Sequence, residues 1–450
     1  MPTFTCSVPE SSPWKYFPFD LGECEDLENY EPGGFHPVYL GDAFDDRYRV
    51  IHKLGFGGFS TVWLARDALT NRESPTYKAR MAIGSHSSIT ESGLFAVVDR
   101  EFWFNGPNGR HLCLVYPVLG PDLSKLSKGI YTRIKPRFAK EVSLLAARAL
   151  AYVHSNGLCH GVDFTVSNIA LRLIDGFNSY EEGDLLNLFG RPQTAPMRTY
   201  SGKPPGSHAP NYITVPLDFS SSKTNVPGIP AKYLAPKVAV GQPASRASDV
   251  WAPGCAIFRI RSGDDIFFDY DTNCPADALR QVVKTVGELP EKWRQTRFDE
   301  KGFPVAEDED GEVFWSLEEA QPLDDRVRTI VDEPAGLFIN GRDEALEAVD
   351  MDEEPAPAMF DNDAALRVPY PAALGSMVWK PTAICIDGSY FTAHSDETYG
   401  MLEAFPRIAE SEASLLVDLP SKIFTYEPAK RIKAEELVTH PWFHSIADSG

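Results

Sequence analysis

The sequence predicts an α+β fold in two lobes, a small strand-rich lobe followed by a larger helical one. Between residues 48 and 117, runs of β-branched and aromatic residues alternate with glycine-containing turns, as in short strands. From Pro136 onward, apolar residues recur instead at the spacing of helices. The chain has 450 residues, of which 43% are apolar and 24% charged, so it is long enough for two or three compact units of ordinary globular composition.

Two pairs of strands are expected in the small lobe. In the first pair, residues 48–51 lead into Gly55 and residues 60–65 lead out of the same turn. The second pair is expected over residues 93–104 and 111–117, joined by a turn rich in Asn and Gly. Both pairs are therefore predicted to be hairpins.

Three helical stretches are expected in the large lobe. The first begins at Pro136 and ends at Gly157. The others cover residues 410–419, stopped by Pro420, and residues 434–438. Proline interrupts a helix because it lacks a backbone N–H, and glycine because its backbone is less restricted.

The expected domain organisation has three parts. Residues 1–47 are rich in Pro, Gly and acids and form an N-terminal extension, followed by a reduced N-terminal lobe over residues 48–120. The C-terminal lobe covers residues 121–446 and contains inserts at about 176–210 and 300–400. The first insert is rich in Gly, Pro, Ser and Asn and the second contains acidic runs, so solvated loops are expected for both.

Charge and cysteine content argue against several classes of protein. A net charge of −21 argues against non-specific nucleic-acid binding, because phosphate backbones are bound by clustered Lys and Arg. An acidic surface suits basic partners, although many acidic proteins have none. The seven cysteines are dispersed and include no CxxC pair, which argues against a disulfide framework or a zinc site. Neither a membrane-spanning run nor a signal peptide is found, so the cytoplasm, the nucleus or both are the expected location.

The turn of the first hairpin is a glycine-rich loop, Gly55–Val62, which reads Gly-Phe-Gly-Gly-Phe-Ser-Thr-Val. A strand–turn–strand unit without Cβ atoms lets backbone N–H groups approach phosphate oxygens. Glycine-rich hairpins are common, but the strand pattern on both sides of this one favours a phosphate-binding loop.

Two later segments resemble the catalytic elements of protein kinases. In His160–Asn168, the residues Asp163 and Asn168 keep the spacing of the catalytic base and a metal ligand. The resemblance implies that Asp163 accepts the proton of the substrate hydroxyl and that Asn168 holds Mg²⁺. Residues 217–220, Leu-Asp-Phe-Ser, match the metal-binding Asp-Phe-Gly element, in which Asp218 supplies a second ligand. An isolated His–Asp pair is more often structural, but the order of the motifs favours the catalytic interpretation.

The chain resembles the SR-protein kinases, in a fungal-type form with a degenerate N-terminal lobe. The similarity covers roughly residues 28–300 and 410–445, and the order of its motifs is highly specific. The gap between Asn168 and Asp218 is similar to the spacer insert of that family. The resemblance implies ATP, Mg²⁺ and Ser/Thr substrates, commonly Arg/Ser-rich splicing factors. The segments that carry it are residues 30–38, 47–55, 60–64, 106–115, 118–121, 160–168, 217–220, 233–237, 248–254, 427–431 and 440–443.

The resemblance also assigns a nucleotide site. It implies that Gly55, Gly57 and Gly58 form the phosphate cradle. It also implies that adenine is held by Leu54, Val62, Ala79 and the backbone of Pro117 and Leu119. The residues implied to contact the nucleotide are Leu54, Gly55, Phe56, Gly57, Gly58, Phe59, Ser60, Val62, Ala79, Met81, Pro117 and Leu119.

The small lobe departs from the family pattern in two ways. Met81 stands where the third kinase strand has a lysine that grips the phosphates, and Lys78 points to the other face of that strand. Residues 82–93 are too few for the usual helix with its connections, and Glu91 is the one acidic candidate among them for the Lys–Glu ion pair of active kinases.

The large lobe carries a third departure. Lys237 replaces the glutamate that normally pairs with Arg431, so either the substrate-binding loop is looser or Arg431 has another partner. Gly161 replaces an arginine that often senses phosphorylation of the activation loop, which argues against control by that route. His160 is displaced by one residue from its usual bracing position. Asp249 keeps its place in the helix that carries a buried structural aspartate.

Two functions from different classes stay open. The first is an ATP-dependent protein serine/threonine kinase of the SR-protein kinase type. The second is a catalytically impaired pseudokinase that binds basic partners, which the absence of both the lysine and its ion-pair helix supports. A third alternative is a gene-model error, in which residues 82–93 and the stretch near 370–400 reflect misplaced exon boundaries.

Overall fold

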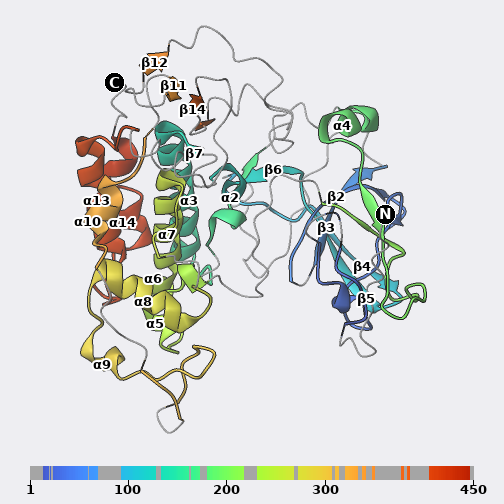
Figure 1. Cartoon of the computed structure of the whole chain (residues 1–450), viewed down its shortest axis with the longest axis horizontal. Helices are drawn as coiled ribbons and strands as arrows, with labels where there is room; N and C mark the ends of the chain where they lie inside the picture. The colour runs from blue at the N-terminus through green and yellow to red at the C-terminus, as the bar shows by residue number, and fades with distance from the viewer. Residues whose placement is uncertain are drawn as a thin grey trace. The chain divides into compact units, whose positions relative to one another are not determined.

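The computed structural model divides the chain into two compact units, one rich in strands and one rich in helices (Figure 1). This composition confirms the predicted α+β fold. The first unit comprises Met1–Leu119, Arg172–Pro227 and Asn362–Pro369, and the second comprises Gly120–Leu171, Gly228–Asp361 and Tyr370–Gly450. The residues that the structure describes are 14–19, 21, 24–58, 60–68, 93–127, 133–161, 164–172, 180–216, 231–267, 272–306, 310–313, 320–332, 337–340, 347–349, 377–379, 383–385 and 405–445.

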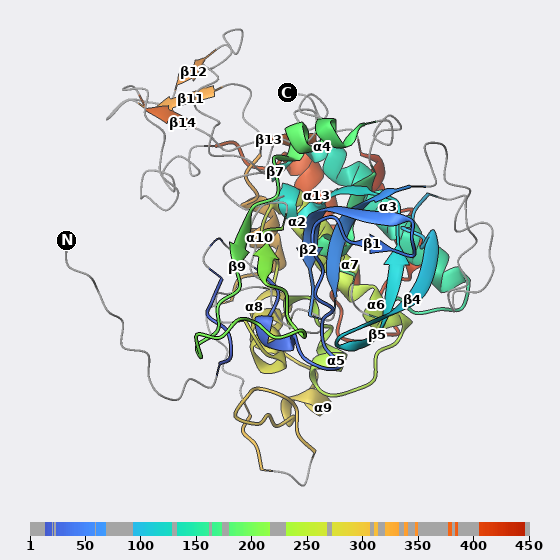
Figure 2. The same cartoon turned by 90° about the vertical axis from the view of Figure 1, so that its right-hand side faces the viewer.

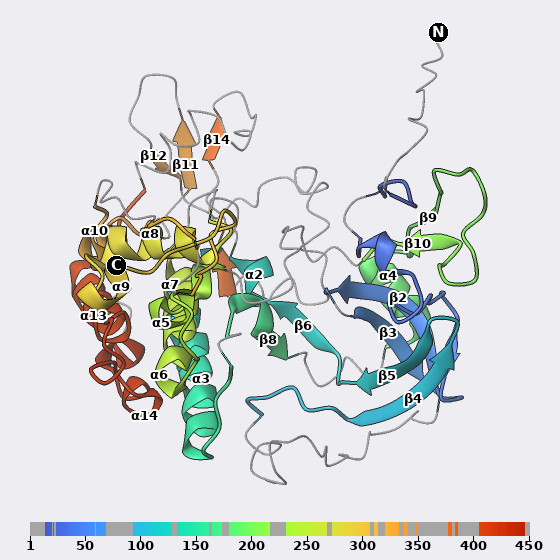
Figure 3. The same ribbon diagram turned by 90° about the horizontal axis from the view of Figure 1, so that it is seen from below.

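The first unit is built on two antiparallel hairpins (Figure 3). Both predicted hairpins are confirmed, although the second one begins later than expected, at Arg100. In the first hairpin, Lys53 lies opposite Trp63 and Gly55 lies opposite Val62. The strands are β1 (Ala43–Phe44), β2 (Tyr48–Phe56) and β3 (Thr61–Asp67) in one sheet and β4 (Arg100–Gly106) and β5 (Gly109–Val115) in the other.

The insert over residues 176–210 contains regular structure, so the expectation of a loop is wrong. It includes α4 (Glu182–Phe189) and strand β9 (Thr194–Pro196), both labelled in Figure 2. β9 pairs with β10 (Tyr212–Thr214), and Figure 3 labels the two strands side by side. α4 begins at a capping box, in which the backbone N–H of Glu181 donates to the carboxylate of the third helical residue at 3.0 Å. Gly and Pro residues on both sides of this short helix obscured it in the composition.

The N-terminal extension packs into the first unit in its described part. Tyr16, Tyr30 and Phe35 are buried and share a hydrophobic cluster with side chains of the insert. Asn108, in the turn between β4 and β5, donates from its amide nitrogen to the carbonyl oxygens of Phe35 (2.5 Å) and His208 (2.6 Å). By contact, the insert therefore belongs with the first unit, whereas the sequence placed it in the helical lobe. The insert contributes Met197, Ala209 and Ile213 to the cluster.

Helices α3 and α7 pack against each other in the second unit and are covered by α13 and α14 (Figure 1). The helix predicted from Pro136 to Gly157 is confirmed, because α3 ends at Ser155 and Gly157 has a left-handed φ of 82°. The predicted helix over residues 434–438 is confirmed as well. The main helices are α3 (Pro136–Ser155), α7 (Trp251–Ser262), α8 (Pro275–Val286), α10 (Leu323–Arg328), α13 (Glu410–Ile423) and α14 (Ala434–Leu437).

Two expectations for the helical unit are corrected. Pro420 lies inside α13 and does not stop it, because burial of Leu419 and Ile423 in the last turn outweighs the lost backbone hydrogen bond. The acidic insert over residues 300–400 contains α10, whose Val327 is fully buried. The shorter elements are η1 (Leu27–Asn29), β6 (Leu119–Asp122), α2 (Leu123–Leu126), β7 (Arg133–Ile134), η2 (Val166–Asn168), β8 (Ala170–Arg172), η4 (Ala231–Tyr233), α5 (Pro236–Ala239), α6 (Arg246–Asp249), α9 (Glu291–Arg294), β11 (Leu337–Asn340), β12 (Glu347–Val349), β13 (Val378–Trp379), β14 (Ala383–Cys385) and η7 (Pro441–His444).

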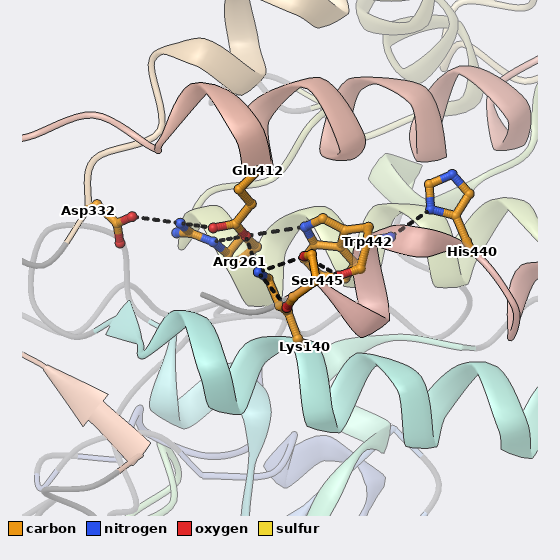
Figure 4. Close-up of polar contacts among 7 residues, drawn as sticks. All are labelled: Lys140, Arg261, Asp332, Glu412, His440, Trp442 and Ser445. Carbon is orange, nitrogen blue, oxygen red and sulfur yellow. Dashed lines mark hydrogen bonds and ion pairs between the residues drawn. The ribbon is translucent and has the colours of Figure 1, made fainter. Parts of the chain in front are cut away.

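A buried ionic network joins several elements of the helical unit (Figure 4). Arg261 of α7 donates to both carboxylate oxygens of Glu412 of α13, at 2.9 and 3.1 Å, and to Asp332 at 2.8 Å. The indole nitrogen of Trp442 donates to Glu412 at 3.2 Å, and the ammonium nitrogen of Lys140 lies 3.7 Å from the same carboxylate. Burial alone would raise the pKa of Glu412, but the hydrogen bonds and charges of Arg261 and Lys140 outweigh burial and lower it. Glu412 therefore stays ionised in the fold.

His36 is a titratable group packed inside the first unit. Its ring lies against Phe44, Phe104 and His111, at centroid distances of 6.0, 4.8 and 5.2 Å. Burial, and to a smaller degree His111, lowers the pKa of His36 to about 4, while the charge of Asp42 acts in the opposite direction.

We expect protonation of His36 to destabilise the fold in mild acid. Its pKa is about 6.5 in an unfolded chain and about 4 in the fold, so the unfolded chain takes up the proton first. Stability that is present above pH 6.5 is therefore lost as the pH falls toward 4, by roughly 1–2 kcal/mol after allowance for solvent screening. Urea unfolding at pH 7 and pH 5 should show a smaller loss in His36→Leu than in the wild type. Equal losses in the two proteins would contradict this expectation.

Candidate functional site

The glycine-rich loop has open space beside its backbone. The N–H of Gly57 donates to the carbonyl oxygen of Ser60 at 2.7 Å, which closes the turn between β2 and β3. Gly55 and Gly57 do not adopt positive φ, and among the described residues no atom lies within 4 Å of the place where either Cβ would stand. Neither backbone conformation nor packing therefore requires glycine here, and the open space fits a phosphate group that approaches the backbone N–H groups.

The residues implied to contact adenine come together in part. Leu54 packs against a buried cluster of Ile51 and Leu64, as does Val118, which stands between Pro117 and Leu119 in the chain. The end of β2 and segment 117–119 therefore border the same apolar cluster. Three further side chains complete it, Leu185 and Leu186 of α4 and Tyr180, which precedes that helix in the chain. Sequence reasoning missed this role of the insert.

Val62 is well placed for a ligand on the first unit. It follows Thr61 at the start of the edge strand β3, lies opposite Gly55 beside the glycine-rich loop, and is 49% exposed. Val62 is exposed beside glycines that packing does not require. This arrangement is consistent with an apolar surface that contacts the planar ring of a nucleotide base.

The buried carboxylate of Asp249 holds the start of the catalytic loop. It is fully buried and accepts hydrogen bonds from the backbone N–H groups of His160 (2.6 Å) and Gly161 (3.1 Å). The ring nitrogen Nε2 of His154 lies 3.3 Å from the same carboxylate. Burial would raise the pKa of Asp249, but these hydrogen bonds together lower it. The prediction of a buried structural aspartate is confirmed.

His154 and Gly161 were not recognised as parts of this arrangement. Gly161 has a φ of 92°, a backbone conformation that favours glycine. This conformation explains why glycine stands where many kinases have arginine. His154 is buried on the same face of α3 as Leu150, one turn earlier, which was the available signal. The ring of His160 packs edge-on against Phe164 at 5.1 Å.

Asn168 is exposed at the end of the short helix η2. Buried Phe164 and Val166 anchor this segment, and the backbone N–H of Asn168 donates to the carbonyl oxygen of Thr165 at 3.0 Å. An amide oxygen of Asn168 and a carboxylate of Asp218 are the hard oxygen donors that Mg²⁺ prefers, so this donor set fits the ion. The described residues contain no group of three or more His, Cys, Asp or Glu side chains that could hold a metal.

Several predicted site residues lie outside the described residues. They are Phe59, Ala79, Met81, Asp163 and Asp218. The identities of the base, of one metal ligand and of the residue that replaces the phosphate-binding lysine therefore stay predictions. The same is true of Glu91 as an ion-pair partner.

Arg431 has another partner in place of the glutamate that Lys237 replaces. This was one of the two alternatives expected from the sequence. Its guanidinium group donates at 2.6 Å to the carbonyl oxygens of both Ala247 and Thr425, and it lies 5.1 Å from the ring centroid of Trp251. Burial lowers the pKa of Arg431 to about 10. Its buried Nε has no hydrogen-bond acceptor among the described residues.

Lys237→Glu is expected to stabilise the fold by about 1–2 kcal/mol. The resemblance implies that a glutamate at this position reaches Arg431, where it would satisfy the buried Nε and compensate the charge. Lys237→Gln is the matched control, since it removes the cation without supplying a carboxylate. Urea unfolding should rank Lys237→Glu above Lys237→Gln, and equal stability of the two variants would show that position 237 does not face Arg431.

Comparison with known proteins finds relatives that are named as protein kinases, and three of them are described here. No family model matches the sequence. The chain is 25% identical over 331 residues to the serine/threonine-protein kinase SRPK of Physarum polycephalum, covering 61% of this chain and 75% of that protein. It is 33% identical over 177 residues to the serine/threonine-protein kinase spk-1 of Caenorhabditis elegans, covering 34% and 17%. It is 31% identical over 181 residues to human SRSF protein kinase 3, covering 35% and 31%.

The coverage of these relatives is uneven. The chain spans three quarters of the first relative but less than a third of the other two. Within the part of the chain that the structure describes, no helix is both long and apolar enough to cross a membrane. The matches agree with the resemblance predicted from the motifs, and the chain is SR-protein kinase-like.

Proposed function

We propose that this chain transfers the γ-phosphoryl group of ATP to Ser and Thr hydroxyls of protein substrates, including Arg/Ser-rich ones. The observation that carries the proposal is that the carboxylate of Asp249 accepts hydrogen bonds from the backbone N–H groups of His160 and Gly161, which precede Asp163 in the sequence by three and two residues. Phosphoryl transfer depends on accurate positioning of the catalytic base, and this anchor supports such positioning for Asp163. The net charge of −21 supports Arg-rich substrates, which an acidic protein attracts over long range.

The chain's own residues divide the work of this reaction. Asp249 fixes the loop so that Asp163 can accept the proton of the substrate hydroxyl. The backbone N–H groups of the glycine-rich loop bind phosphate oxygens, and Asn168 and Asp218 hold the metal. When bound, Mg²⁺ neutralises charge on the phosphate oxygens of ATP. The proposed setting is the cytoplasm or the nucleus, without direct binding to nucleic acid or membrane.

Phosphate transfer to a peptide tests the proposal. The full chain is incubated with Mg²⁺, γ-labelled ATP and an Arg/Ser-rich peptide, and compared with Asp163→Asn. We expect transfer by the wild type and a loss of about 100-fold or more in the variant, the usual contribution of a general base. A peptide with Lys in place of Arg measures how far substrate choice depends on arginine. Absence of transfer by the wild type would overturn the proposal.

The second candidate is a pseudokinase that binds a basic partner. Met81 at the usual lysine position favours it, because no cation at that place would grip the phosphates. Such a protein would bind the Arg/Ser-rich peptide without labelling it. Peptide binding measured beside transfer therefore separates the two functions.

A further inference from the structure

A buried ion pair joins the N-terminal extension to the strand that precedes the glycine-rich loop. Glu25 and Lys53 are 2% and 0% exposed, and the ammonium nitrogen of Lys53 contacts Oε2 of Glu25. The hydroxyl of Tyr30 donates to the other carboxylate oxygen at 2.5 Å. Lys53 directly precedes Leu54 and Gly55, where the implied nucleotide site begins.

The charge of Lys53 lies among aromatic rings at the base of the loop. Its ammonium nitrogen is 5.4 Å from the ring centroid of Trp63 and 5.9 Å from that of Phe56. Phe56 ends β2 and Trp63 lies near the start of β3, so the two rings stand on the two strands from which the loop emerges. Lys53 therefore contacts both ends of the loop.

Glu25 is held in place by its own segment. Asp26 caps the short helix η1 (Leu27–Asn29) through its side chain. Tyr30, which donates to Glu25, packs edge-on against buried Phe35 at a centroid distance of 5.8 Å. The carboxylate is therefore a fixed partner and differs from a mobile surface charge.

We infer that Glu25 is a positioning residue for the glycine-rich loop: through Lys53 it fixes the two strands that carry the loop. A buried ion pair is weak evidence for stability, because desolvation offsets its attraction, whereas its demand for a defined geometry can select one arrangement. The ordering of the loop strands stands independently of the proposed function. Tighter binding of ATP by a fixed loop is the consequence that rests on that function.

Lys53 does not replace the lysine missing at position 81. Residues directly opposite each other in a sheet share a face, so Lys53 and Trp63 point to the same side. Val62, implied to face adenine, precedes Trp63 in β3 and points to the other side. The charge of Lys53 is therefore directed toward the extension.

Hydrogen exchange tests the inference without nucleotide. The double variant Glu25→Gln/Lys53→Met removes both charges while keeping similar shapes, so no buried charge is left unpaired. We expect the amides of β2 and β3 to exchange about tenfold faster in it, with the amides of α3 unchanged. The matched control is Arg49→Met/Glu182→Gln, which removes an exposed ion pair from the same strand and should exchange like the wild type.

Two results would overturn the inference. One is exchange of β2 and β3 in the double variant at the wild-type rate. The other is equally faster exchange in α3 or failure to fold, which would make the pair a general stabilising element. Binding of Mg·ATP by calorimetry is the second readout, with affinity expected to fall about tenfold in the double variant. If the wild type binds no Mg·ATP, the proposed function fails, and hydrogen exchange still decides the role of Glu25.

Discussion

Glu412→Ala is expected to lower the free energy of unfolding by about 3–5 kcal/mol, the usual cost of removing one partner from a buried ion pair. The carboxylate of Glu412 accepts hydrogen bonds from Arg261 and Trp442 and lies beside Lys140. Among the residues that the structure describes, the alanine variant leaves the two buried cations of this network with Asp332, at its edge, as their remaining carboxylate partner. Urea unfolding of the full chain measures the loss.

Glu410→Ala is the matched control on the same helix. Glu410 is exposed and pairs with exposed Arg328, so water and salt screen the interaction and its loss should leave stability unchanged within error. Because the pKa of Glu412 is lowered in the fold, its contribution is present above pH 4.5 and should disappear as the pH falls below that value. Equal effects of the two substitutions would contradict a buried network.

Asp249→Ala is expected to reduce phosphate transfer by about 100-fold or more. The substitution frees the backbone N–H groups of His160 and Gly161 and the ring of His154, so the segment that precedes Asp163 in the sequence loses its anchor. A displacement of about 1 Å in a catalytic group can cost 100-fold in rate. The loss should appear in kcat, with the KM for ATP nearly unchanged, because the glycine-rich loop belongs to the other unit.

Instability must be separated from this catalytic effect. Buried donors left without acceptors also destabilise, by about 1–3 kcal/mol each. Glu412→Ala provides a variant of comparable instability whose substitution lies outside the catalytic loop. Assayed at a temperature where both variants are folded, Glu412→Ala should keep most of its activity and Asp249→Ala should not. An equal loss in both would assign the effect of Asp249 to stability alone.

Local patterns predicted the elements whose structure depends on neighbouring residues. Both hairpins follow from β-branched runs around turns, and α3 follows from apolar spacing closed by Gly157. Pro420 shows where local reasoning fails, since tertiary burial carries α13 past it. α4 escaped notice because the short helix is stabilised by its capping box and by packing on β2 and β3, and composition reveals neither.

The site was predictable where chemistry and spacing coincide. Asp249 was expected to be buried and is, because its motif is tied to one structural role. The acceptors of Arg431 are backbone carbonyl oxygens, and a pattern of side chains in the sequence does not predict such partners. The pair Glu25–Lys53 could not be predicted, because its two residues lie far apart in the sequence. The N-terminal segment contains many acidic residues, and each was an equivalent candidate for the partner of Lys53.

Calorimetric titration of ATP into the full chain, with and without Mg²⁺, most directly tests a metal-dependent nucleotide site. Asn168 and Asp218 are proposed to act through the metal, so affinity should fall at least about tenfold when Mg²⁺ is withheld. The same loss should follow from Asp218→Ala in the presence of Mg²⁺. Overall affinity should be modest, since Met81 offers the phosphates no charge. Equal affinity of the wild type with and without Mg²⁺, unchanged by Asp218→Ala, would contradict a kinase site and favour a pseudokinase pocket.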